Sequence, residues 1–401
     1  MTSLDSVLLR GVEKIYPSTD SLSDLLKSGR KLRIYYGIDP TSPNIHIGHS
    51  VPLNKLSELQ NLGHKIILLF GDFTAMIGDP SERTIERKQL TAKEIKQNVA
   101  TYKNQVAKII SFRKNPPEIV YNSSWWEKMS QADFFSLLSK FTTSQLLERD
   151  MFQERIKKNK PIFVSEFLYP ILQGYDSVAL DVDMEIGATD QTFNMMVGRQ
   201  LLRQEKNKEK FVLTTPLLEG TDGRKMSKTY ANSINLMENP NDMFGKAMSI
   251  KDDLIVKYFT LATNVSSKQI AEISKKIQEK SINPIGAKKK LAYQLVRKYH
   301  SEEVAKKAQE EFERVFQKGG RTTNIETITK PKSLLPVSYA SLTTLSGGTE
   351  SVSEAVRLAE NKGLRFDGKL IENPRENIPQ PSSETVIDIG KRKSIRIVWE
   401  D

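Results

Sequence analysis

The 401-residue sequence contains no cysteine and only four histidines. The lack of cysteine excludes disulfides, thiolate nucleophiles and cysteine-ligated zinc, and four dispersed histidines leave little for a histidine-rich metal site. We therefore expect no metal site built by the protein itself. Any metal should be Mg²⁺ that arrives with a nucleotide.

Long apolar runs are missing too. None approaches the roughly 20 residues that span a bilayer, and residues 1–11 lack the basic start and apolar middle of a secretion signal. We therefore expect a soluble, cytoplasmic protein without a membrane partner. The Gly-rich Walker string that ends in Gly-Lys-Ser or Gly-Lys-Thr is also absent, which excludes the ordinary phosphate-cradling loop.

Positive charge is in excess, at a formal +11. Residues 246–330 hold 18 Lys and Arg against 10 Asp and Glu, a net charge of +8, whereas residues 1–245 carry a net charge of only +3. A phosphate-backbone surface would explain this concentration, and so would a set of solvated helix faces. Composition therefore fits a nucleic-acid partner without requiring one.

Short apolar runs alternate with amphipathic stretches over the first 230 residues. Strands are predicted at 32–38, 65–71, 118–121, 182–186 and 211–215. The alternation predicts an α/β catalytic domain over 1–230, with a Rossmann-like doubly wound parallel sheet. In such folds, ligands bind at the carboxyl ends of the strands.

The rest of the chain predicts two more domains. Lys- and Glu-rich helical patterns, such as those at 268–280 and 287–299, predict an α-helical domain over 231–320. Residues 321–336 have little pattern and contain two prolines, which predicts a linker. Residues 337–401 form a third, small unit.

This tail predicts a small α+β domain. A short helix at 353–361, a strand and turn at 363–369 and a hairpin over 386–399 follow the order of the RNA-binding module of ribosomal protein S-four, which the tail resembles. From residue 338 on, the chain contains 9 basic and 10 acidic residues, so an RNA contact depends on a local basic cluster. Its members are Lys391, Arg392, Lys393 and Arg396. A solvated turn would carry the same charges.

The first of two short motifs follows the strand at 32–38. His46-Ile47-Gly48-His49 opens a helical pattern at 45–62. His46 and His49 lie one turn apart at its start, where free backbone N–H groups and the helix dipole attract phosphate. Because Gly48 has no side chain, an adenine or ribose can approach the backbone. An ordinary amphipathic helix with two surface histidines would look the same.

The second motif, Lys225-Met226-Ser227-Lys228, follows the strand at 211–215 and comes directly after a loop with two glycines. Lys225 and Lys228 can fold over a triphosphate and neutralise the charge that builds as pyrophosphate departs. A solvated lysine loop is the plain alternative. Taken together, the two motifs favour ATP chemistry.

The two motifs resemble the HIGH and KMSKS signatures of class I aminoacyl-tRNA synthetases, with Thr229 in place of the last serine. With the segments 35–41, 169–176 and 187–191, the chain is similar over nearly its whole length to the bacterial tyrosyl-tRNA synthetases. It matches their branch without a tryptophan after the Asp-Gln pair, since Thr192 stands there.

This resemblance implies a tyrosine–tRNA ligase (EC 6.1.1.1). Such an enzyme activates L-tyrosine with ATP and Mg²⁺ and passes the tyrosyl group to tRNA(Tyr), and its helical domain reads the anticodon. The resemblance also implies a homodimer with a dimerisation region at about 120–165. By spacing alone, residues 134–155 could form a packed helix pair at an interface or part of the core.

The resemblance assigns a role to each matched residue. Tyr35 and Asp176 would contact the phenolic hydroxyl, Tyr169, Gln173 and Asp79 the α-ammonium, and Gln191 would lie near the carboxylate. The ATP-binding set is Asp39, His46, Gly48, His49, Gly187, Asp190, Lys225, Met226 and Lys228, with Asp190 on the ribose. The catalytic set is Thr41, His46, His49, Lys225 and Lys228, and Arg83 and Arg87 would clamp pyrophosphate. Each polar residue alone could instead be a satisfied buried hydrogen bond or a surface charge.

Three other functions stay open at this point. A tryptophanyl enzyme is disfavoured by Tyr35 together with Asp176 and by the tail. A nucleotidyltransferase that activates another carboxylate would not need the basic helical domain. A catalytically inactive paralogue that binds RNA is disfavoured by the intact His46, His49, Lys225 and Lys228.

Overall fold

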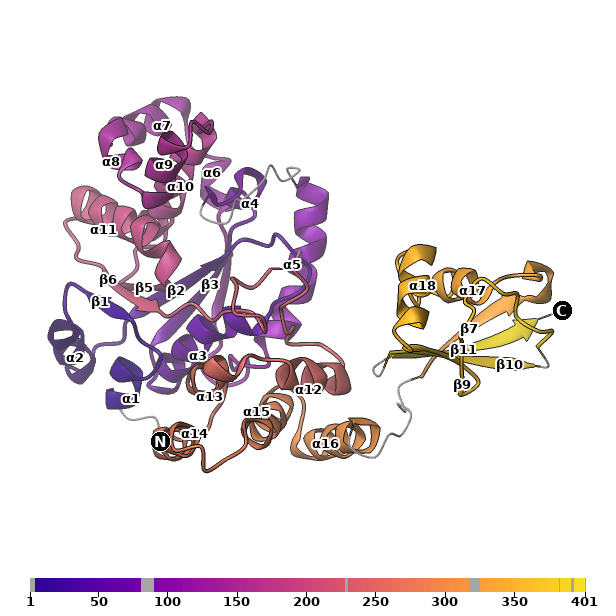
Figure 1. Ribbon diagram of the computed structural model, residues 1–401. Coiled ribbons are helices and arrows are strands. Elements are labelled where there is room, and N and C mark those ends of the chain that lie inside the picture. Colours follow the sequence, from indigo (N-terminus) through magenta and orange to yellow (C-terminus); the bar gives the residue numbers. More distant parts are fainter. Residues whose placement is uncertain are drawn as a thin grey trace. The chain divides into compact units, whose positions relative to one another are not determined.

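The computed structural model describes residues 4–80, 90–227, 230–316, 325–381, 383–390 and 393–400 (Figure 1). Internal contacts divide the chain into two compact units. The larger comprises residues 1–238 and 246–299, and the smaller comprises 239–245 and 300–401. No helix in these described ranges is long and apolar enough to cross a membrane.

The larger unit contains a six-stranded sheet in the order β1-β6-β5-β2-β3-β4. Its strands are β1 Lys14–Tyr16, β2 Arg33–Ile38, β3 Lys65–Phe70, β4 Glu118–Tyr121, β5 Met184–Ala188 and β6 Phe211–Thr215. Strands β2 to β6 pair in parallel, while β1 runs antiparallel to β6. The five predicted strands are confirmed, and the short edge strand β1 has no counterpart among them.

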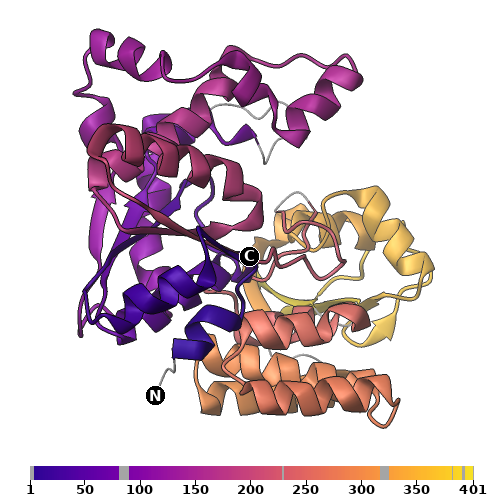
Figure 2. The same cartoon turned by 90° about the vertical axis from the view of Figure 1, so that its left-hand side faces the viewer.

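Helices cover both faces of this sheet (Figures 1 and 2). Helix α3 Ile47–Asn61 links β2 to β3 on one face, while α10 Val164–Leu180 and α11 Thr192–Lys206 pack together on the other. From β2 the strand order runs outward through β3 and β4 on one side, and from β5 it runs outward through β6 on the other side. The strand order therefore reverses between the neighbouring strands β2 and β5. The carboxyl ends of strands at such a switch point form the usual ligand crevice.

The segment 134–155 does not form the helix pair that its apolar spacing allowed. It lies in three short helices, α7 Gln131–Leu138, α8 Thr143–Leu147 and α9 Asp150–Lys157. The physical reason lies in a helix start within the segment. The Thr142 hydroxyl accepts the Gln145 N–H and the Gln145 side chain accepts the Thr142 N–H, a capping box that begins α8.

The larger unit contains further helices, and three of them lie beyond residue 230. Before that residue come α1 Leu4–Leu9, α2 Thr19–Lys27, α4 Thr74–Ile77, α5 Ala92–Val106 and α6 Ser123–Trp126, and after it come α13 Ile255–Ala262, α14 Ser267–Gln278 and α15 Pro284–Tyr299. The buried Tyr299 hydroxyl lies 2.9 Å from the Ser50 hydroxyl of α3. The helices α13, α14 and α15 therefore pack in the same compact unit as the sheet. The functional boundary at residue 230 stays a prediction.

The smaller unit contains a five-stranded sheet in the order β7-β11-β10-β8-β9. Its strands are β7 Ile325–Pro331, β8 Leu364–Phe366, β9 Lys369–Leu370, β10 Glu384–Ile389 and β11 Lys393–Glu400, and its helices α16 Glu302–Phe316, α17 Tyr339–Leu345 and α18 Val352–Glu360. A further helix, α12 Pro240–Met248, lies across the boundary of the two units in the sequence. The predicted tail helix, turn and hairpin are confirmed.

Part of the predicted linker is wrong. Residues 325–331 form β7, which pairs in parallel with β11 along its whole length. Ile328 of β7 packs against the buried core of the tail. The partner strand lies more than 60 residues away in the sequence, so local pattern alone did not reveal the pairing.

Candidate active site

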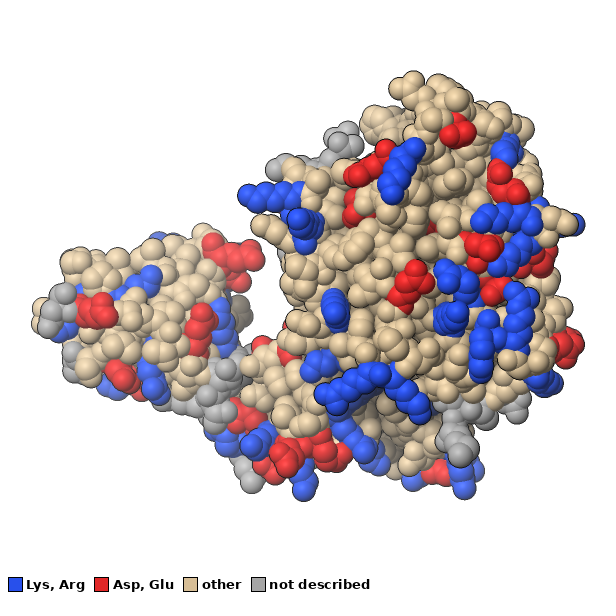
Figure 3. Space-filling model, turned by 180° about the vertical axis from the view of Figure 1, so that it is seen from behind, with Lys and Arg blue, Asp and Glu red and all other residues tan. Residues whose placement is uncertain are grey.

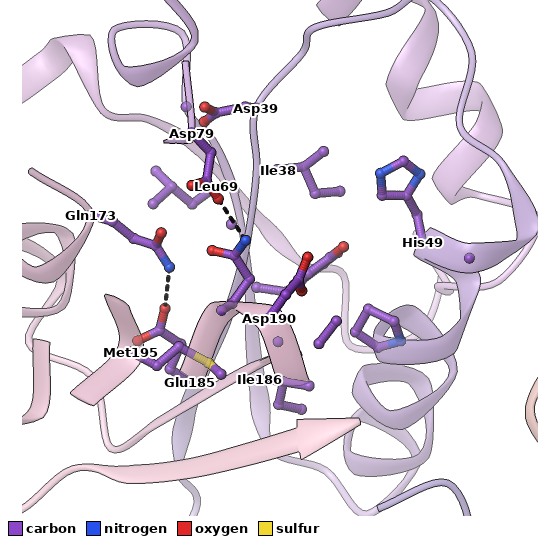
Figure 4. Close-up of a pocket in the computed structure, with 18 of the residues that line it drawn as sticks. Ile38, Asp39, His49, Leu69, Asp79, Gln173, Glu185, Ile186, Asp190 and Met195 are labelled. Atoms are coloured by element: carbon purple, nitrogen blue, oxygen red, sulfur yellow. Dashed lines mark hydrogen bonds between the residues drawn. The ribbon is translucent and has the colours of Figure 1, made fainter. Parts of the chain in front are cut away.

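One cavity of the larger unit lies at the carboxyl ends of the central strands (Figure 4). Fifteen predicted site residues line it: Tyr35, Asp39, Thr41, His46, Gly48, His49, Asp79, Tyr169, Gln173, Asp176, Gly187, Asp190, Gln191, Lys225 and Met226. The fold thus brings together segments that are almost 200 residues apart. Arg83, Arg87 and Lys228 lie outside the described residues.

His49 projects into the cavity from α3, on the side opposite Gln173 and Glu185 (Figure 4). His46 is the N-cap of α3, and its Nδ1 accepts the Gly48 N–H at 3.2 Å. A neutral imidazole with Nδ1 as acceptor carries its proton on Nε2, which can donate to a ligand. The two histidine rings lie 3.9 Å apart between centroids.

Both histidines are uncharged at neutral pH. Burial first, and then the neighbouring His49 and Lys225, hold the pKa of His46 well below its usual value. Burial lowers the pKa of His49 to about 4, with Asp190 acting in the opposite direction and Lys225 in the same one. The pair therefore offers hydrogen-bond donors rather than positive charge.

We expect this burial to make folding stability pH-dependent. Between pH 6.5 and about 4 the unfolded chain binds protons at His49 that the folded chain does not, so stability falls as the pH falls through this window. The slope is at most about 1.4 kcal/mol per pH unit for each such histidine. The free energies of unfolding of wild type and His49→Ala, measured with urea at a series of pH values, should converge as the pH falls toward 4. Parallel pH dependences would contradict a neutral, buried His49.

Lys225 of the second motif is paired with Asp190, the residue assigned to the ribose. Lys225 Nζ donates to Asp190 Oδ2 at 2.8 Å, and both side chains are partly exposed. Asp190 lies in a single 3₁₀ turn, Thr189–Gln191, directly after β5. The two residues assigned to ribose and phosphate therefore lie within one hydrogen bond of each other.

Gly48 has no room for a side chain. A Cβ there would lie 2.9 Å from the His46 ring and 3.2 Å from Met226 Sδ. We expect Gly48→Ala to displace these groups and to raise KM for ATP about tenfold, since overpacking typically costs about 1–3 kcal/mol. ATP-dependent kinetics with saturating amino acid would measure the change. An unchanged KM would show that neither group needs its present position.

Asp176 lies at the opposite, fully buried end of the cavity. Its carboxylate accepts hydrogen bonds from Trp125 Nε1 at 3.0 Å, Trp126 Nε1 at 3.4 Å and Asn122 Nδ2 at 3.4 Å. Burial raises the pKa of Asp176 well above its usual value, and these three N–H donors act in the opposite direction. The side chain is thus an acceptor with a fixed orientation.

Tyr35 shares this buried end. Its hydroxyl lies 3.0 Å from Ser177 Oγ. Burial raises the pKa of the Tyr35 hydroxyl, and the Glu185 and Asp176 carboxylates act in the same direction. Tyr35 is therefore un-ionised and can donate its proton.

A chain of amides fixes the polar middle of the cavity. Gln173 Nε2 donates to Glu185 at 3.2 Å, and Gln191 Nε2 donates to Asp79 at 2.6 Å (Figure 4). Asn194 donates to both glutamine oxygens, at 2.9 Å to Gln173 and 3.1 Å to Gln191. Two predicted ligands of the amino acid are therefore held in one network.

Asp39 lies nearer the amino-acid side than its predicted ATP role suggests. Tyr169 Oη donates to its carboxylate at 2.9 Å, and Thr74 Oγ1 donates at 2.8 Å. Asp39 thus orients Tyr169, which is assigned to the α-ammonium.

Sequence reasoning missed the residues that support the pocket. They are Thr74, Asn122, Trp125, Trp126, Glu185 and Asn194. Two of them were detectable, because Trp125 and Trp126 are adjacent in a chain with only three tryptophans. Asn194 lies one helical turn after Gln191, a spacing that predicts a shared helix face.

The two described members of the tail's basic cluster contact the tail itself. Lys393 donates to the Gly347 carbonyl, and Arg396 pairs with Glu384 at 3.6 Å. Lys391 and Arg392 lie outside the described residues. The RNA contact assigned to this cluster stays a prediction.

The family model for class I tRNA synthetases (W and Y) matches residues 27–317. The chain therefore belongs to the class I tRNA synthetases, and its doubly wound sheet brings the first motif and the described part of the second to one cavity. The tyrosine–tRNA ligase of Thermotoga maritima is 44% identical over 95% of this chain and 94% of its own length. That of Haemophilus influenzae is 41% identical over 99% and 98%. The chain belongs to the bacterial tyrosyl-tRNA synthetase family.

Solved structures agree in fold. A C-terminally truncated mitochondrial tyrosyl-tRNA synthetase of Aspergillus nidulans superimposes with a TM-score of 0.63 at 21% identity, over 76% of this chain and 91% of that one. The tyrosyl-tRNA synthetase of Archaeoglobus fulgidus, solved with L-tyrosine, gives 0.61 at 24% identity, over 76% and 98%. At these identities the likeness concerns the fold.

Proposed function

We propose that this protein joins tyrosine to tRNA(Tyr) in two steps. The first forms tyrosyl-adenylate and pyrophosphate from L-tyrosine and ATP, and the second passes the tyrosyl group to the 3′ end of the tRNA. One observation carries the proposal. A single cavity has a buried end lined by Tyr35 and Asp176, and at its other end His46, His49 and Lys225, which can bind phosphate.

In the first step, a carboxylate oxygen of tyrosine attacks the α-phosphorus of ATP. The bond between that phosphorus and the bridging oxygen breaks, and its electron pair leaves with pyrophosphate. The enzyme contributes positioning and charge stabilisation, without a covalent intermediate on the protein. The neutral His46 and His49 donate hydrogen bonds to the phosphate, and Lys225 supplies positive charge. We assign Thr41, which lines the same cavity, and Lys228 to this set as well.

The remaining ATP contacts follow from the same cavity. Ribose hydroxyls that bind Asp190 would compete with its bond to Lys225, and this competition would free the lysine for the phosphates. Gly187 and Met226 line the space beside them. Mg²⁺ would come bound to the ATP phosphates, and Arg83 and Arg87 remain our candidates for a pyrophosphate clamp.

Tyrosine is selected at the buried end. Its phenolic O–H would donate to Asp176 and its oxygen would accept from Tyr35, while Tyr169, Gln173 and Asp79 hold the ammonium group and Gln191 lies near the carboxylate. Phenylalanine would leave buried polar groups unpaired. Tyrosyl-tRNA synthetases are themselves the established example of this effect, at about 10⁵-fold.

The tRNA partner would use the basic segment after residue 246 and the tail. On the face seen in Figure 3, Lys and Arg side chains are interspersed with Asp and Glu. Several basic side chains of the segment 246–330 are paired with acidic ones, such as Lys257 with Glu219 and Lys288 with Asp252. We propose that RNA phosphates replace some of these partners, which would make tRNA binding strongly salt-dependent. A cytoplasmic location also stays a prediction.

A homodimer is the expected assembly. Within 120–165, large apolar side chains are exposed, with 69% of Phe135, 47% of Ile156 and 48% of Phe163 accessible. Exposed apolar patches often mark protein–protein interaction sites. Sedimentation at micromolar concentration should give twice the mass of the chain. A monomer under these conditions would contradict the dimer.

Charging of total tRNA tests the complete reaction. With ATP, Mg²⁺ and radiolabelled tyrosine, label should appear on tRNA that carries a tyrosine anticodon and on no other. Label with tryptophan in place of tyrosine would favour the tryptophanyl alternative. Adenylate formation without any charged tRNA would favour a nucleotidyltransferase.

A further inference from the structure

A buried lysine lies behind the amino-acid pocket, outside every motif described above. Lys210 directly precedes β6, and it is completely inaccessible to solvent. Its Nζ forms an ion pair with Glu185 and donates to Ser177 Oγ at 2.8 Å. A buried ammonium is costly unless it is paired and hydrogen-bonded, so these contacts must offset a large desolvation penalty.

The fold reserves space for this ammonium group. Gly198 of α11 packs directly over it, and a Cβ at that position would lie 2.7 Å from Lys210 Nζ and 2.6 Å from Ser177 Oγ. Side chains larger than hydrogen are therefore excluded from the helix face above the lysine. The cluster of Lys210, Ser177 and Glu185 is a closely packed part of the structure.

Hydrogen-bond direction in this cluster follows from donor and acceptor capacity. An ammonium group can only donate, so Lys210 occupies an acceptor site of Ser177 Oγ. The other contact of Ser177 Oγ is the Tyr35 hydroxyl, at 3.0 Å. If Ser177 donates to Tyr35, both polar functions of Ser177 are satisfied, and the Tyr35 proton is directed either to Glu185 or to a ligand in the pocket.

The opposite direction is unfavourable. If Tyr35 donated to Ser177, the serine proton would have no acceptor among the contacts of the described residues, although Ser177 is completely buried. Unpaired buried polar groups are rare in proteins because they cost stability. Glu185 is a second acceptor within reach of the Tyr35 hydroxyl. Because its two oxygens already accept from Gln173 and Lys210, Glu185 stays paired when Tyr35 donates to a substrate instead.

We propose that Lys210 is a positioning residue for amino-acid specificity. Acting through Ser177, it sets the Tyr35 hydroxyl as a donor to the phenolic oxygen of the substrate. Asp176 then accepts the phenolic proton, so the two ends of the substrate hydroxyl meet one donor and one acceptor. The inference rests on the proposed function, because it requires that the pocket binds tyrosine.

Two variants separate this role from a merely structural one. Ser177→Ala removes the link to Tyr35 and keeps the Lys210–Glu185 ion pair, and Lys210→Met removes the donor itself. Each should lower kcat/KM for tyrosine about tenfold, chiefly through KM, because one buried hydrogen bond is lost. Neither should lower kcat/KM for phenylalanine, which has no hydroxyl to orient. The ratio of the two constants should thus fall about tenfold.

Lys208→Met is the matched control. Lys208 lies two residues before Lys210 and pairs with Asp181 and Asp183 at the opposite end of the strands, away from the cavity lining. It should leave the tyrosine-to-phenylalanine ratio unchanged. Amino-acid-dependent pyrophosphate exchange measures all of these constants.

The outcomes are distinct. Equal losses for tyrosine and phenylalanine, or an unchanged ratio in Ser177→Ala, would overturn the role of Lys210 and leave the proposed function standing. Should Lys210→Met fail to fold, the ratio in Ser177→Ala decides. Wild-type protein that shows no exchange with tyrosine would overturn both proposals.

Discussion

Asp176→Asn is expected to lose about 10²- to 10³-fold in kcat/KM for tyrosine, since hydrogen bonds to a charged group contribute about 1.5–3 kcal/mol and unpaired buried donors add to the loss. Three N–H groups, from Asn122, Trp125 and Trp126, point at the native carboxylate. An amide would turn its own NH₂ toward one of them or toward the substrate. Either arrangement leaves two donors facing each other in a buried site.

The loss should be confined to tyrosine. Phenylalanine makes no bond to residue 176, so its kcat/KM should change little and the preference for tyrosine should largely disappear. Asp24→Asn, an exposed position in α2, is the matched control and should leave both constants unchanged. If Asp176→Asn kept its preference for tyrosine, the phenolic hydroxyl would have to bind elsewhere.

His49→Ala is expected to reduce the rate of adenylate formation about 10²- to 10³-fold, the usual cost of removing one preorganised donor from a developing anion. The affinity for tyrosine should stay the same, because His49 lies across the cavity from Gln173 and Glu185 (Figure 4). Single-turnover activation at varied tyrosine concentration separates the two quantities. A loss that occurs in kcat and not in the tyrosine dissociation constant marks a contact made in the transition state.

His64→Ala provides the comparison within the same unit. His64 is also buried, and its Nδ1 accepts the Leu32 N–H at 3.3 Å near the start of β2, away from the cavity lining. Its loss should lower thermal stability and leave the activation rate nearly unchanged. If the two histidine variants lost activation rate equally, His49 would have no special role at the phosphate.

Much of the fold could be predicted from local pattern, and the failures have physical causes. The central strands β2 and β3 are near-continuous apolar runs buried on both faces, a signal that does not depend on distant residues. β1 has three residues and β7 is mostly exposed, so neither carries a clear period. Each of them is stabilised by pairing with a strand far away in the sequence.

The candidate site divides in the same way. Tyr35, His46 and Asp176 belong to motifs with fixed local spacing, and the cavity brings them together as expected. Asn194 and Lys210 belong to no motif, and their importance appears only from buried contacts. A lysine just before a strand is ordinarily solvent-exposed, so nothing in its local sequence indicated that Lys210 is buried.

Pyrophosphate exchange into ATP, with tyrosine, tryptophan and phenylalanine supplied in turn, tests whether one cavity combines a phosphate-facing motif pair with a pocket for a phenol. We predict rapid exchange with tyrosine, and exchange with tryptophan and phenylalanine lower by several orders of magnitude. Exchange with tryptophan but not with tyrosine would contradict a cavity built for a phenol.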